Sequence, residues 1–82
     1  MKALEVSVNG HRACMAGIRR GVLTVHVSRL SNARTEFISL DVGGREEVGP
    51  PLRWPMPKIG VGDEVTIRVV DMDTIDSPAK GL

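Results

Sequence analysis

Apolar and polar residues alternate along most of this chain, which is the period-two pattern of strands that bury one face. Residues 4–8 follow the pattern, and Asn9-Gly10 comes directly after them. Both turn residues tolerate the positive φ of a type I′ hairpin turn. The pattern therefore predicts a strand over residues 4–8 and a return strand over about residues 11–18.

Three more segments have strand character. Residues 22–30 are rich in β-branched side chains, residues 37–42 alternate clearly, and Asp63 opens the strong segment 64–71 after a glycine turn. No window shows a helical period of 3.6 residues. The predicted inward-facing rows are Leu23, Val25 and Val27, then Ile38, Leu40 and Val42, and finally Val65, Ile67 and Val69.

The connections between these segments set the predicted architecture. Arg19-Arg20 is predicted to be a two-residue loop that places Cys14 opposite Val25, and Gly43-Gly44 is predicted to end the fourth strand. Residues 45–59 hold four prolines and show no period. We therefore expect an all-β fold, a five-stranded antiparallel meander that forms a small barrel or sandwich. It occupies residues 1–72 as a single domain, and residues 73–82 form a C-terminal tail that frays.

The length of 82 residues allows one small domain with a thin core, which buries only roughly 60–65% of the unfolded surface. Cys14 is the only cysteine, so an internal disulfide is excluded, and a reducing compartment fits. The formal net charge of +1 gives no electrostatic reason to expect nucleic acid or a membrane as partner. With no secretory signal pattern, the sequence predicts a soluble cytoplasmic protein, for which self-association would add buried surface.

Candidate catalytic chemistry is sparse. His11 and Cys14 are three residues apart, so on a regular strand they point to opposite faces and cannot share a metal. His26 lies on the other face from Cys14 in the predicted hairpin register. Asp71 and Asp73 lack the glycine and glutamate of a calcium loop. The sequence therefore predicts no catalytic residue, no metal site and no cofactor, and so not an enzyme.

Trp54 is the strongest candidate for a binding residue. It lies in a proline-bounded segment beside Arg53, in a chain with only one other aromatic residue. Two interpretations stay open: the indole closes one end of a thin core, or it is a ligand or partner anchor on a stiff loop. Arg12, Arg19 and Arg20 form a second candidate set, near the predicted second turn.

Five stretches together resemble a group of small, soluble bacterial proteins that carry no assigned function. They are "LEVSVNGHRACMAG", "GVLTVHVSRLS", "LDVGG", "LRWP" and "VGDEVTIRVVD". The resemblance covers most of residues 4–72 and implies the same order of hairpin, strand, Gly-Gly loop, Arg-Trp-Pro segment and final strand. It implies no catalytic residues. A frame this compact also suits a stand-alone mobile gene cassette.

The function expected from these observations is binding, with a homodimer or higher homo-oligomer as the functional form. Leu23 to Val27 carries no charge except a neutral histidine, and such a strand left at an edge would pair with another chain. Two alternatives remain. One is an accessory or inhibitory protein that contacts a larger partner through the Trp54 loop. The other is a small-ligand or nucleic-acid binder at a barrel mouth.

Overall fold

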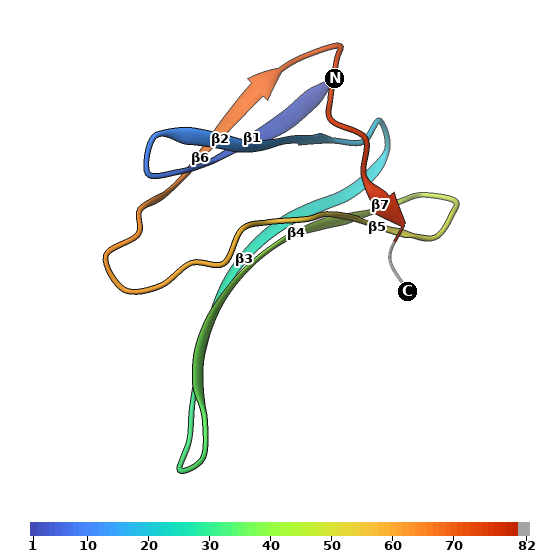
Figure 1. Cartoon of the computed structure of the whole chain (residues 1–82). Helices are drawn as coiled ribbons and strands as arrows, with labels where there is room; N and C mark the ends of the chain where they lie inside the picture. Colours follow the sequence, from blue (N-terminus) through green and yellow to red (C-terminus); the bar gives the residue numbers. More distant parts are fainter. Residues whose placement is uncertain (81–82) are drawn as a thin grey trace.

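The first of two antiparallel sheets pairs the N-terminal hairpin with a strand from late in the chain. A computed structural model describes residues 1–80, and in it β1 (Lys2–Val8) lies between β2 (His11–Gly17) and β6 (Val65–Asp71) (Figure 1). The predicted turn at Asn9-Gly10 is confirmed, with φ values of 53° and 81°. The predicted turn before β6 is confirmed as well, because Asp63 accepts a hydrogen bond from Gly60 N at 2.7 Å.

The second sheet is built on a long hairpin. β3 (Gly21–Ser31) and β4 (Glu36–Glu46) pair along their whole length, and β5 (Pro51–Trp54) and β7 (Ala79–Lys80) follow in the order β3-β4-β5-β7. The far end of the hairpin extends away from the first sheet (Figure 1). Leu40 and Val42 face the core as predicted, and Ile38 lies on the same face of β4.

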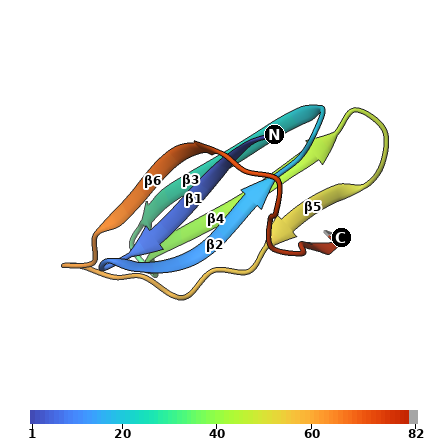
Figure 2. The same cartoon turned by 90° about the horizontal axis from the view of Figure 1, so that it is seen from above.

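The core lies between the facing sheets. Val6, Cys14 and Ala16 from the first sheet meet Leu40, Val42 and Trp54 from the second. Seen from above, β6 lies over β3 on one side of the molecule, and β2 and β5 lie toward the other side (Figure 2). The two-layer arrangement therefore has two lateral sides, one with β3 and β6 and the other with β2 and β5.

The predicted all-β class is confirmed, and the predicted five-stranded meander and closed barrel are wrong. Residues 1–80 contain six strands of four or more residues and the two-residue β7, in two separate sheets. The error begins at Arg19-Arg20, where the chain crosses from one sheet to the other and β2 does not pair with β3. The predicted pairing of Cys14 with Val25 is wrong for the same reason. No helix in residues 1–80 is long and apolar enough to span a membrane.

The Gly43-Gly44 pair lies within β4 and does not end it, which corrects a second prediction. A Cβ added to Gly44 would lie 2.7 Å from the Val22 carbonyl oxygen, so the glycine allows the two strands to approach closely. The proline-rich segment also contains a strand, β5. Pro51 is its first residue, a position where a proline can enter a sheet without breaking the ladder.

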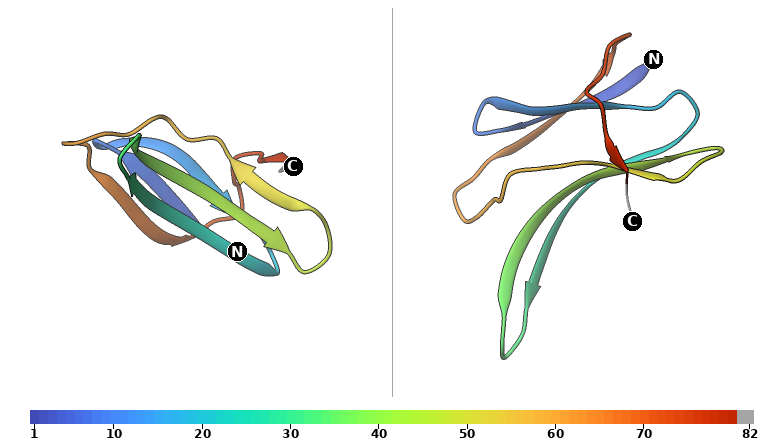
Figure 3. Two further views of the ribbon diagram at one scale, coloured as in Figure 1. Left: turned by 90° about the horizontal axis from the view of Figure 1, so that it is seen from below. Right: turned by 45° about the vertical axis from the view of Figure 1, so that its right-hand side comes forward.

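The predicted tail, residues 73–82, is described as far as Lys80, and that part lies against both sheets. The Asp76 carboxylate accepts a hydrogen bond from Met15 N at 2.8 Å, and Asp76 N donates to the Met15 carbonyl oxygen at 2.9 Å. The chain then reaches β7, which pairs with β5. This segment, residues 72–78, passes from one sheet to the other (Figure 3) and is called the strap below.

Candidate interaction surface

Trp54 is part of the core. Its side chain is only 2% exposed, and it lies opposite Val42 in the β4–β5 ladder. The indole Nε1 donates a hydrogen bond to the backbone carbonyl oxygen of Asp76 at 2.9 Å, so its one polar group is satisfied by the strap. Of the two interpretations open at the level of sequence, the structure therefore shows the first, in which Trp54 closes one side of the core.

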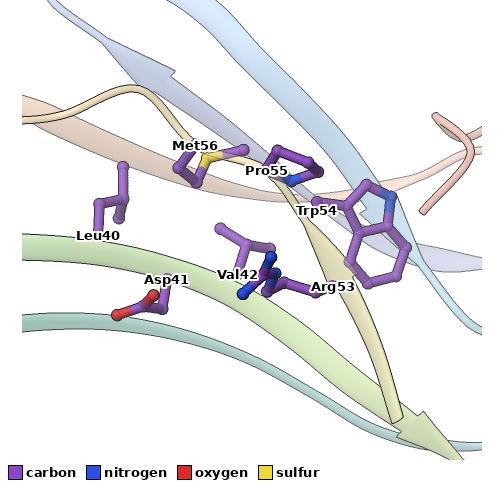
Figure 4. Close-up of a pocket in the computed structure, with 7 residues that line it drawn as sticks. All are labelled: Leu40, Asp41, Val42, Arg53, Trp54, Pro55 and Met56. Carbon is purple, nitrogen blue, oxygen red and sulfur yellow. The ribbon is translucent and has the colours of Figure 1, made fainter. Parts of the chain in front are cut away.

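A shallow groove of about 260 Å³ lies beside Trp54, between the middle of β4 and the segment that follows β5. Leu40, Pro55 and Met56 line it, and Asp41 and Arg53 bring opposite charges to it (Figure 4). Trp54 contributes little accessible area to this groove because its side chain is buried. Arg53, the second candidate of this segment, is exposed.

The three remaining arginine candidates do not form one cluster. Arg12 lies near the start of β2, and Arg19 and Arg20 follow its end, roughly 20 Å farther along at about 3.3 Å per residue. Arg19 and Arg20 adjoin the turn that carries Glu46 and Glu47. Since two carboxylates share this surface with two guanidinium groups, the turn presents no strongly basic patch.

Cys14 and the two histidines lie apart. Cys14 is buried, and the pKa of its thiol is raised above the usual value. Burial is the larger cause, and the nearby Asp76 carboxylate is the second. His11 is exposed at the start of β2, and His26 is exposed on β3, paired with Asp41 across the outer face of the second sheet. Among residues 1–80, no three histidine, cysteine or acidic side chains are grouped to hold a metal ion.

The side of the molecule bounded by β3 and β6 exposes apolar side chains that share the inner faces of the sheets. Ile67 pairs with the fully buried Val6 yet is 46% exposed, and Val69 on the same face is 74% exposed. Val27 pairs with the buried Leu40 and is 58% exposed. The predicted inward rows are thus on the correct faces, but at this side nothing within residues 1–80 covers them. This β3/β6 side is the open side of the molecule.

β3 is an edge strand along all its 11 residues. The pairing of β3 with β4 continues one residue beyond each end, where Asn32 N donates to the Thr35 carbonyl oxygen and Glu47 N donates to the Arg20 carbonyl oxygen. Hydrogen-bonded pairs alternate with non-hydrogen-bonded ones in an antiparallel ladder. The even-numbered residues of β3 therefore bond to β4, and the odd-numbered ones direct their N–H and C=O groups to the free edge.

The other sheet edges in residues 1–80 are covered or protected. The strap bonds to β2 at Met15, and β7 covers β5. β6 carries Arg68 at its middle, held by an ion pair to Glu5 at 3.3 Å, and a charge on an edge strand opposes pairing with another chain. β3 has one charged residue, Arg29, near its far end. It is therefore the longest unprotected edge in the described chain.

The low charge of residues 23–27 points to this surface, but nothing in the sequence indicates that β3 lies at a sheet edge. Comparison with family models, with curated proteins and with solved structures finds no match to this chain. The resemblance to small bacterial all-β proteins therefore stays a prediction.

Proposed function

We propose that the protein is a non-enzymatic binding module whose functional form is a homo-oligomer. The observation that carries the proposal is the free edge of β3, a strand of 11 residues beside apolar side chains that the fold leaves exposed. An unpaired strand edge of this length is a template for another strand. Most soluble oligomers are symmetric assemblies of one chain, and such an assembly would cover this surface.

The Trp54 loop has less support as the contact site. The indole is buried and its N–H is bonded to the strap, so using it as an anchor would require the core to open. The open side needs no such rearrangement. Its apolar side chains and backbone groups are already accessible in the folded chain.

Light scattering coupled to size-exclusion chromatography at micromolar concentration tests the proposal. We expect a mass at least twice the 8.9 kDa of one chain. V27K places an inward-pointing charge at the edge of β3 and should shift the mass to that of a monomer. V61K makes the same change at an exposed turn residue and should not. A monomer mass for the unmodified protein at all concentrations would contradict the proposal.

A further inference from the structure

The sequence of β3 is close to a palindrome about His26, its middle residue. Val25 and Val27 flank the histidine, and Thr24 and Ser28, both hydroxyl residues, flank them in turn. Farther out, Val22 corresponds to Leu30, another aliphatic residue, whereas the pairs Leu23/Arg29 and Gly21/Ser31 break the symmetry. A twofold interface requires a surface that complements itself, which a palindromic strand provides.

We propose that two copies of the chain pair through β3, antiparallel and about a twofold axis at His26. This inference rests on the proposed function and adds its interface and register. Joining the two edges makes one continuous sheet across the dimer, in which Val25 lies opposite Val27 of the second copy. Thr24 lies opposite Ser28 of the second copy, a pairing that allows a hydroxyl hydrogen bond.

The backbone of β3 fits this register. Odd-numbered residues direct their N–H and C=O groups to the free edge, so a hydrogen-bonded pair across the interface must join two odd-numbered residues. Val25 of one copy and Val27 of the other meet this condition. His26 of one copy then lies opposite His26 of the other in a non-hydrogen-bonded pair. A shift of the register by one residue would place odd-numbered residues opposite even-numbered ones, whose N–H and C=O groups point away from the free edge. It would also place the apolar inner-face side chains of one copy beside the polar outer-face side chains of the other.

The side chains support the same arrangement. Val25 and Val27 lie on the inner face, so pairing them across the axis extends the apolar interior from one copy into the other. The strand that carries the exposed Ile67 and Val69, β6, lies over β3 on the side where the second copy would join (Figure 2). Arg29 lies opposite Leu23 of the second copy, where its aliphatic stem can cover the leucine while the guanidinium stays in water.

The other long edge could not pair with itself in the same way. Arg68 is the middle residue of β6, and a twofold pairing centred there would place two guanidinium groups opposite each other. The middle residue of β3 is His26, which lacks the permanent charge of an arginine side chain. The structure therefore favours a second copy on β3.

Cysteine cross-linking tests the register. In the proposed dimer the two copies of residue 26 are about 4.5 Å apart at Cα, inside the range of about 4.4–6.8 Å that a disulfide spans. H26C should therefore become a covalent dimer under mild oxidation. S28C is the matched control on the same exposed face. Its two copies would be offset by four residues, about 14 Å, and should stay unlinked.

The unmodified protein under the same oxidation gives the baseline, because Cys14 is buried. Far-UV circular dichroism checks that both variants keep the wild-type fold. A dimer mass together with at least tenfold more cross-linking for H26C than for S28C supports the inference. A dimer mass with H26C unlinked, or with S28C linked equally, overturns the interface and leaves the proposed function standing. A monomer mass overturns both.

Discussion

The two sides of the molecule are built from similar strands, but one side is covered by another segment of the chain and the other is exposed to solvent. On the side of β2 and β5, the strap crosses between the sheets, satisfies the Trp54 indole and bonds to the backbone of Met15. On the side of β3 and β6, side chains on the same inner faces are open to solvent, with Val69 74% exposed. One side is closed by the chain itself, and the other has no cover within residues 1–80.

This difference shows that the alternation of apolar and polar residues fixes which face a side chain takes, and a separate element decides whether that face is buried. Val6 and Ile67 are cross-strand neighbours on one face, but only Val6 has the second sheet fully over it. A small domain with one open side has a thinner core than its apolar content allows. Association at that side would add the missing burial.

The largest expected effect is on the closed side. W54A removes the largest fully buried side chain, and the loss of unfolding free energy should be about 3–5 kcal/mol. Urea unfolding followed by far-UV circular dichroism measures it, since the only tryptophan is lost. W54F keeps most of the packing and should lose clearly less. A loss below about 1 kcal/mol for W54A would mean that the indole is not a core group.

A smaller loss is expected where the strap meets β2. D76A removes the carboxylate that accepts from Met15 N, and leaving that buried N–H without an acceptor should cost about 1–3 kcal/mol. D76N keeps a side-chain oxygen in the same place and should retain most of the stability. Equal stability of D76A and the unmodified protein in urea unfolding would show that the strap does not hold this side closed.

The smallest effect is expected on the open side, in a matched pair of nearly isosteric changes. V6T places a hydroxyl at a fully buried position and should cost about 1–3 kcal/mol. V69T makes the same change on the same face of the neighbouring strand and should stay within about 0.5 kcal/mol. Thermal unfolding at concentrations where the chain is monomeric compares them. Similar losses for the two variants would contradict the division into a closed and an open side.

The sequence predicts the local parts of this fold well. The Asn9-Gly10 hairpin follows from turn chemistry alone, and the alternating row of Ile38, Leu40 and Val42 takes the predicted face. In both cases the cause lies within a few residues of the effect. Composition and position single out the candidate arginines and Trp54, and the structure places Trp54 in the core.

The non-local pairings could not be predicted in this way. Nothing in the turn at Arg19-Arg20 shows that β3 will leave β2 for another sheet, because that choice depends on the 11-residue ladder with β4. Gly43-Gly44 has the composition of a turn, and only the close Val22 carbonyl explains why it lies within a strand. Exposure of Val69 likewise depends on the arrangement of whole sheets.

β1 lies between β2, which follows it directly in the sequence, and β6, which is more than 50 residues away. Lys2 of β1, for example, pairs with Asp71 of β6. The hairpin of β1 and β2 can form as soon as its residues leave the ribosome, but the first sheet stays one strand short until β6 is made. Such distant pairing is slow, because most of the chain must be closed into a loop before the contact is gained. The edge of β1 is therefore unpaired during synthesis, and an unpaired strand edge makes an incompletely folded chain prone to aggregate.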